Sequence, residues 1–176
     1  MFPGISVIIV NYNAGMELFR CVQSIAGTDV NVEILVVDND SRDDSIQQLQ
    51  TQYNGAKPLR ILKNNKNLGF AAACNQGSRV ASGKYLLNLN PDCLVEPTTI
   101  SVLLQCLQDN PQAGMAGGLI LNNDGSEQRG CRRDIPTPWK SIVNSFGLRN
   151  LALLNRKLFS DFRLDQSELP SEPVAV

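Results

Sequence analysis

The feature of this sequence that most constrains its fold is a regular alternation of short apolar runs with segments of helical periodicity. Residues 5–10 (ISVIIV) and 32–37 (VEILVV) are rich in β-branched residues and almost continuously apolar. Such runs are typical of strands that are buried on both faces of a sheet. Residues 59–62, 85–89 and 113–121 are further runs that we interpret as strands. The sequence therefore predicts five strands.

Helical segments are expected between these strands, because apolar residues recur there at intervals of three and four. Ser41 is expected to cap the second helix. A helix rich in small residues is expected over 69–81, with Gly83 as its stop, and another over 98–108. This order of elements predicts an α/β fold with a mostly parallel sheet and helices on both faces.

The chain of 176 residues is long enough for one domain with a proper core. The alternating pattern loosens late in the chain, so we expect a core domain over 1–121 and an incomplete second region over 122–176. That region contains a basic, proline-rich loop at 129–138 and a segment at 139–162 that we expect to be helical. Its last residues resemble the start of another strand, so we expect the chain to be a fragment.

The composition excludes several functional classes. The sequence contains no histidine, which excludes Ser-His and Cys-His nucleophile pairs and histidine-ligated metals within this chain. Any metal is then a hard cation on oxygen ligands. The net charge of −1 argues against a nucleic-acid partner. Five scattered cysteines without a CxxC pair indicate reduced thiols in a cytoplasmic protein, and no run of about 18 apolar residues predicts a membrane span.

Polar residues follow four of the predicted strands. The carboxyl ends of parallel strands and the N-termini of the following helices share one edge of a sheet, where ligands bind. Asn and Asp side chains can pair with a base and with ribose hydroxyls, Tyr12 can stack on a base, and Asp92 can hold a divalent cation. The alternative is structural, because Asn and Asp also form turns and caps after strands and a single glycine such as Gly69 is more often a turn residue.

Four motifs, SVIIVNYN, VVDNDSRDDS, NKNLGFAAACNQG and YLLNLNPDC, in this order and spacing resemble family 2 glycosyltransferases. The rhamnosyltransferase-like members of bacterial polysaccharide synthesis look most similar. The resemblance covers 5–121 and extends weakly over 125–138. It implies the GT-A fold, which is Rossmann-like, and an inverting transfer of a sugar from a nucleotide-diphosphate sugar, with Mg²⁺ or Mn²⁺. The acceptor would be a saccharide or a lipid-linked molecule.

The resemblance also implies a set of donor-binding residues. Residues 11–13 would border the nucleoside, and Asp38 would meet the base or ribose. Asn67, Gly69 and Asn75 would shape the nucleoside and phosphate pocket. The final Asp of the Asn90-Pro91-Asp92 motif would bind the metal, while Asn90 keeps an oxygen ligand but lacks a charge. The full set is Asn11, Tyr12, Asn13, Asp38, Asn39, Ser41, Asn67, Gly69, Asn75, Asn90 and Asp92.

Family members carry a catalytic carboxylate in a later segment, where it deprotonates the acceptor hydroxyl. We expect this base beyond Val176, because Asp134, Asp161, Asp165 and Glu168 stand in the wrong sequence context. The fragment by itself is therefore expected to be inactive and to bind the donor weakly at most.

Two alternative functions remain open. A nucleotidyltransferase would carry a glycine-rich, basic loop after the first strand, but the first basic residue here is Arg20. A domain that binds nucleotides without transfer activity is the second alternative. The basic segment 139–162 is either an ordinary covering helix or a helix at the inner face of a membrane, where lipid-linked acceptors reside.

Overall fold

The computed structural model describes residues 4–122, 124–128 and 138–145. The chain divides into two compact units, Met1–Gln105 and Cys106–Val176. The first unit contains the sheet and the predicted site. The expected domain boundary after residue 121 stays a prediction.

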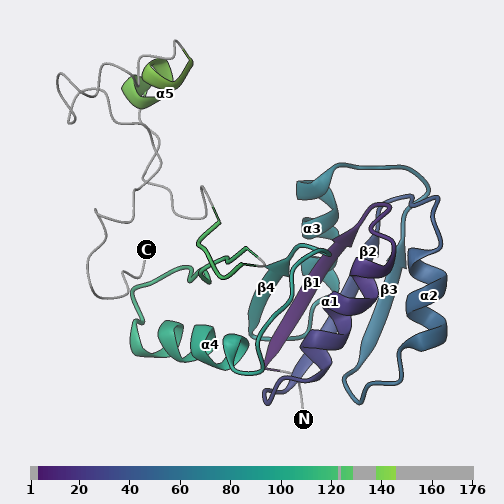
Figure 1. Cartoon of the computed structure of the whole chain (residues 1–176). Coiled ribbons are helices and arrows are strands. Elements are labelled where there is room, and N and C mark those ends of the chain that lie inside the picture. Colours follow the sequence, from purple (N-terminus) through teal and green to yellow (C-terminus); the bar gives the residue numbers. More distant parts are fainter. Residues whose placement is uncertain (1–3, 123, 129–137, 146–176) are drawn as a thin grey trace. The chain divides into compact units, whose positions relative to one another are not determined.

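The first unit is built on four parallel strands in the order β3-β2-β1-β4 (Figure 1). The strands are β1 (Ile5–Asn11), β2 (Val32–Asp38), β3 (Leu59–Lys63) and β4 (Tyr85–Leu89). Every residue of β1 and β2 is buried, which explains why their sequences are almost continuously apolar. The predicted parallel α/β fold is thereby confirmed.

Three helices cover the two faces of this sheet. Helices α1 (Met16–Ala26) and α2 (Ser45–Gln52) cover one face, and α3 (Phe70–Val80) covers the other (Figure 1). The sheet contributes alternate side chains to the two cores, as the period of two along a strand requires. Residues buried in the α1 and α2 core include Val7, Ile9, Leu18, Val22, Ile25, Val36 and Leu49, and those in the α3 core include Ile8, Val10, Leu35, Val37 and Ala73.

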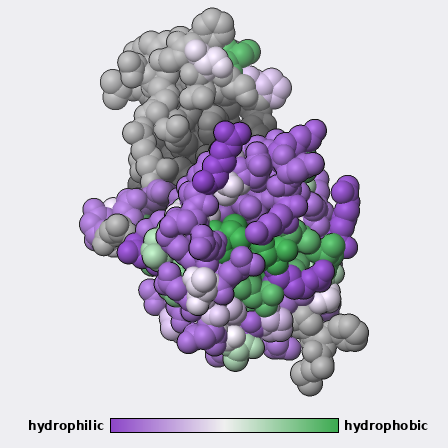
Figure 2. All heavy atoms as spheres, turned by 90° about the vertical axis from the view of Figure 1, so that its right-hand side faces the viewer, coloured by the Kyte–Doolittle hydropathy of each residue, from purple (hydrophilic) through white to green (hydrophobic). Residues whose placement is uncertain are grey.

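β3 forms one edge of the sheet. Its apolar residues Leu59, Ile61 and Leu62 are only half-buried. Seen from the side of α2 and β3, the surface has a hydrophobic area surrounded by hydrophilic residues (Figure 2).

Two further helices follow β4. The predicted helix over 98–108 is confirmed as α4 (Thr99–Asp109), and Ile100 from this helix joins the α1 and α2 core. Of the helix expected over 139–162, the structure describes α5 (Pro138–Ser145), and the rest lies outside the described residues. Within the described ranges, no helix is long and apolar enough to cross a bilayer.

The fifth predicted strand, over 113–121, is wrong. The segment forms no strand, and Leu121 makes only an isolated antiparallel bridge with Glu127. Gly114, Gly117 and Gly118 interrupt the run, and glycine inside a strand weakens it. Met115, Leu119 and Leu121 are 68%, 53% and 54% exposed, so the run lacks the burial on both faces on which the prediction of a strand was based.

Two predicted helix signals are also wrong. Helix α2 begins at Ser45 with Asp44 in the N-cap position, so Ser41 does not cap it. Helix α3 ends at Val80, and Gly83 does not have the positive φ of a helix stop. Gly83 instead allows a close approach of backbones, because a Cβ atom there would lie 2.5 Å from the backbone nitrogen of Ser6.

A buried carboxylate joins the elements at the amino-terminal end of the sheet. Glu33 is 5% exposed, and its Oε1 accepts hydrogen bonds from Ser6 Oγ at 2.5 Å, Ser82 N at 2.6 Å and Ser82 Oγ at 2.7 Å. Burial raises the pKa of Glu33, but the hydrogen bonds from Ser6 and Ser82 and the charge of Arg60 outweigh it and lower the pKa. Glu33 therefore holds the α3–β4 connection as an ionised group.

Replacing Glu33 by Gln is expected to lower the free energy of unfolding at neutral pH by about 2 kcal/mol, because charge-assisted hydrogen bonds are lost. The folded-state pKa of Glu33 lies below its ordinary value of 4.5. Its contribution is therefore complete above that value and is lost as the pH falls through the folded-state pKa. Urea unfolding of both proteins at several pH values measures the difference, which should shrink under acid. The exposed Glu96→Gln is the control, and a difference that does not change with pH would contradict this assignment.

Candidate functional site

The first part of the site is the end of β1, where Asn11 connects three segments. The side chain of Asn11 is fully buried, and its Nδ2 shares its two hydrogens among three acceptors, Asp38 Oδ1 at 3.1 Å and the hydroxyls of Ser41 and Ser45, each at 2.9 Å. Its Oδ1 is buried without a hydrogen-bond partner among the described residues. The amide of Asn11 therefore fastens the end of β1 to the end of β2 and the start of α2.

The loops that follow β1 and β2 are also bonded directly to each other. Asn13 N donates to Ser41 Oγ at 3.0 Å, Arg42 N donates to Asn13 Oδ1 at 2.7 Å, and Gly15 N donates to Asp43 Oδ2 at 2.8 Å. Asn13 has a positive φ of 55°, which asparagine tolerates better than most residues. Burial raises the pKa of Asp43, but hydrogen bonds from Ser45 and Gly15 outweigh it and lower the pKa.

A third set of bonds attaches the loop before α3. Asn39 is 2% exposed; its Nδ2 donates to Asn67 Oδ1 at 2.8 Å, and its Oδ1 accepts from Asn64 Nδ2 at 3.2 Å and Leu68 N at 2.9 Å. Gly69 N donates to Asn67 Oδ1 at 2.9 Å, and the φ of 83° at Gly69 requires glycine. Loops after β1, β2 and β3 thus form one connected network.

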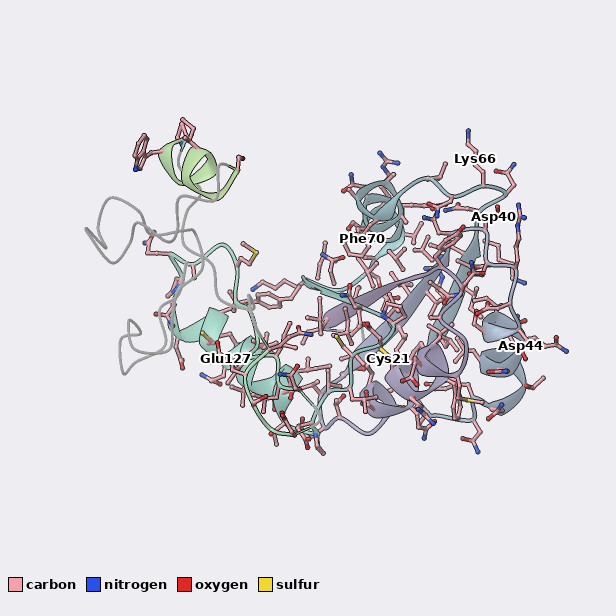
Figure 3. The ribbon with its side chains drawn as sticks, turned by 45° about the horizontal axis from the view of Figure 1, so that its top comes forward. Cys21, Asp40, Asp44, Lys66, Phe70 and Glu127 are labelled. Carbon is pink, nitrogen blue, oxygen red and sulfur yellow. The ribbon has the colours of Figure 1, made fainter. Side chains whose placement is uncertain are left out.

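Exposed side chains lie on these connected loops. Tyr12 is 54% exposed, Leu68 is 42% exposed and Phe70 is 55% exposed. In Figure 3 the loops with Asp40 and Lys66 lie close together on the first unit, and Phe70 lies at the start of α3. Phe70 is a candidate that the sequence analysis missed; the available signal was an aromatic residue at the start of a helix, directly after a polar loop.

The end of β4 carries Asn90 and Asp92, both of which are exposed. Because β4 pairs with β1 and β1 pairs with β2, all in parallel, the carboxyl ends of β4 and β2 are separated by two strand spacings, about 10 Å. In the described part of the chain, no lysine or arginine lies within ion-pair distance of Asp92. Cys93 Sγ is 3.8 Å from Asp92 Oδ1.

Two thiols lie beside this segment. Burial raises the pKa of Cys21 to about 12, with further contributions from Cys93 and Asp92. Burial and the charge of Asp92 also raise the pKa of Cys93. Both thiols are therefore protonated at neutral pH and are poor nucleophiles.

The carboxylate of Asp92 could bind a cation that is also bound by a second, non-protein molecule. Within the described residues, no group of three His, Cys, Asp or Glu side chains could hold a metal ion. An exposed carboxylate supplies an oxygen ligand of the kind that Mg²⁺ and Mn²⁺ prefer, and the remaining coordination positions would be filled by ligands other than these side chains. Asn90 offers a second, neutral oxygen on the same segment.

The structure brings together all but one of the predicted site residues at the carboxyl ends of the strands. Asn75 is exposed on α3, two residues from each of the buried residues Ala73 and Gly77. Two residues correspond to about 200° around a helix, so Asn75 faces away from the sheet. Its role stays a prediction.

Replacing Asn39 by Ala is expected to release the loop over 64–69, because three side-chain hydrogen bonds of a buried amide are lost. The free energy of unfolding should fall by about 2 kcal/mol. Hydrogen exchange of the Leu68 amide should become faster than exchange in β1. Asn65→Ala, at an exposed position of the same loop, is the control and should change neither quantity.

The chain has relatives among curated proteins. It is 28% identical to glycosyltransferase GlyG of Streptococcus pneumoniae serotype 4 over 89% of this chain and 58% of GlyG. It is 30% identical to N-acetylglucosaminyl-diphospho-decaprenol L-rhamnosyltransferase of Mycobacterium tuberculosis over 68% of this chain and 42% of that protein. The chain thus spans less than two thirds of the length of either relative.

A solved structure with a similar fold is the mannosyltransferase PcManGT from Pyrobaculum calidifontis in complex with GDP-Man and Mn²⁺. It is 22% identical, covers 62% of this chain and 34% of its own chain, and superposes with a TM-score of 0.56. This likeness confirms the GT-A fold. Residues 6–163 match glycosyl transferase family 2, and the chain therefore belongs to that family.

Proposed function

We propose that this chain is the donor-binding part of a glycosyltransferase that uses a nucleotide-diphosphate sugar. The observation that carries the proposal is the connected edge of the sheet, where the loops after β1, β2 and β3 are bonded to one another. The exposed Tyr12 lies on one of these loops, and the exposed Asp92 follows the neighbouring strand β4.

The proposal divides the predicted residues into two groups. Asn11, Asn39 and Ser41 form side-chain hydrogen bonds to neighbouring loops, and these bonds hold the loops in place. Tyr12 is exposed and would stack on the base. Asp38 is oriented by bonds from Asn11 Nδ2 and Ser41 N to its Oδ1, so that its second oxygen would accept from the base or the ribose.

Asp92 would hold Mg²⁺ or Mn²⁺ between the protein and the diphosphate, with Asn90 as a neutral neighbour. A divalent cation at this place neutralises the diphosphate and stabilises it as a leaving group. The Mn²⁺ in the structure of the mannosyltransferase supports a cation with a donor of this class. Phe70, at the start of α3, would supply an apolar surface beside the donor.

The finer proposal is an inverting transfer to a saccharide or lipid-linked acceptor in the synthesis of polysaccharide or cell-surface glycan, with the catalytic base outside the described residues. The name of the mycobacterial relative, which joins L-rhamnosyl transfer to a decaprenol-linked acceptor, supports a rhamnosyl donor and a lipid-linked acceptor. Trp139 and Ile142, three residues apart on α5, are 47% and 44% exposed. Such a pair supports contact with the cytoplasmic face of a membrane.

Calorimetric titration with UDP, GDP and dTDP, each with Mn²⁺ or with EDTA, tests this proposal. One nucleotide should bind, and Mn²⁺ should tighten its binding. Asp92→Asn should weaken binding in Mn²⁺ by about tenfold, which corresponds to about 1.4 kcal/mol, and should leave binding in EDTA unchanged.

Glu96→Gln is the matched control, because it removes an exposed carboxylate four residues from Asp92. Absence of binding by all three nucleotides, or equal effects of both substitutions, would overturn the proposal. Sugar transfer from the corresponding nucleotide sugar then separates the proposed glycosyltransferase from a nucleotide-binding domain without transfer activity: binding with transfer indicates the enzyme, and binding alone indicates the domain without activity.

A further inference from the structure

The segment that carries Asp92 is attached to helix α1 at both of its ends. Cys21 Sγ donates to the backbone oxygen of Asn90 at 3.5 Å. Val95 N donates to Ser24 Oγ at 3.2 Å. Asp92 lies between these two attachment points.

Cys21 and Ser24, which make these two hydrogen bonds, lie on the same side of α1 and are bonded to each other. Cys21 and Ser24 are three residues apart on α1, so they project from the same side of the helix. Ser24 Oγ donates its only hydrogen to Cys21 O at 2.7 Å. A hydroxyl that has used its hydrogen can still accept, so the bond within α1 leaves the Ser24 oxygen oriented as an acceptor for Val95.

The segment itself closes into a turn at Asn90. Cys93 N donates to the same Asn90 oxygen at 3.2 Å, so this oxygen accepts from both α1 and the turn. The turn Asn90–Cys93 therefore has a fixed start, and Asp92 is its third residue.

Apolar packing contributes little to holding this segment. Asn90, Asp92 and Leu94 are exposed, with Leu94 at 66%; Pro91, Cys93 and Val95 are half-buried, and Val95 packs against the α1 and α2 core. The hydrogen bonds to Cys21 and Ser24 are consequently the specific contacts that set the place of the segment relative to α1.

We infer that Cys21 and Ser24 are positioning residues that place the carboxylate of Asp92 for cation binding. This inference rests on the proposed function. Neither side chain contacts the donor or the metal; both act through the backbone of the segment. A ligand that is held by a displaced segment binds its cation less tightly, and loss of such supporting contacts typically weakens metal affinity by 10- to 100-fold.

The test compares the dissociation constants of the nucleotide that the whole chain binds most tightly, measured in Mn²⁺ and in EDTA. Ser24→Ala should reduce the tightening by Mn²⁺ by about tenfold and should change the constant in EDTA by less than about twofold. Ser24→Thr retains the hydroxyl and should restore the effect of Mn²⁺. A merely structural role would weaken binding equally under both conditions.

Ser78→Ala is the matched control, because Ser78 Oγ also donates to a carbonyl within its own helix, that of Cys74 at 2.9 Å. If Ser24→Ala does not fold, Cys21→Ala and Cys21→Ser provide the same comparison, because Ser retains a donor and Ala does not. Unchanged tightening by Mn²⁺ in folded Ser24→Ala or Cys21→Ala overturns the positioning role. If Asp92→Asn abolishes the tightening in that same experiment, the proposed function stands, whereas failure of the unaltered chain to bind any nucleotide ends both proposals.

Discussion

The structure of the candidate site depends on the parallel pairing of β1 with β2 in a register that sets Asn11 beside Asp38. Both strands end at this pair, and the backbone bond from Asn39 N to Asn11 O at 2.8 Å extends their contact by one residue. A shift by one residue would turn every side chain of a strand to the opposite face. Because both faces of β1 and β2 are buried, the cores fix this register and thereby bring the two polar loops together.

The sequence was sufficient to predict the strands that are buried on both faces, because continuous apolar runs have few other interpretations. The sequence was insufficient where the same pattern of residues can arise for two different structural reasons. The apolar run at 113–121 resembled a strand, but its three glycines weaken a strand and Leu119 is exposed rather than buried. Gly83 resembled a helix stop, but the close approach of the Ser6 backbone explains it, and spacing along a chain does not reveal a neighbour that is distant in sequence.

The sequence predicted which strand ends carry the candidate site residues, whereas it did not predict the hydrogen-bond partner of each side chain. Strand ends identify which residues share an edge, but they do not show that Asn11 and Asn39 bond to neighbouring loops. Phe70, Cys21 and Ser24 were missed for a related reason. Phe70 begins a helix, and Cys21 and Ser24 belong to α1, where the pattern indicates only an apolar face and a polar one.

The network around Asn39 is composed of carboxamides from Asn64 and Asn67 together with backbone amides. Carboxamides carry no net charge and do not titrate, so this part of the edge keeps the same electrostatic character across the physiological pH range. A rim made of carboxylates with the same shape would repel a polyanion and would compete for its counter-ion. The amides thus make the connection between Asn39 and the loop over 64–69 rigid without adding charge, whereas the neighbouring connection between the loops after β1 and β2 contains the carboxylates of Asp38 and Asp43.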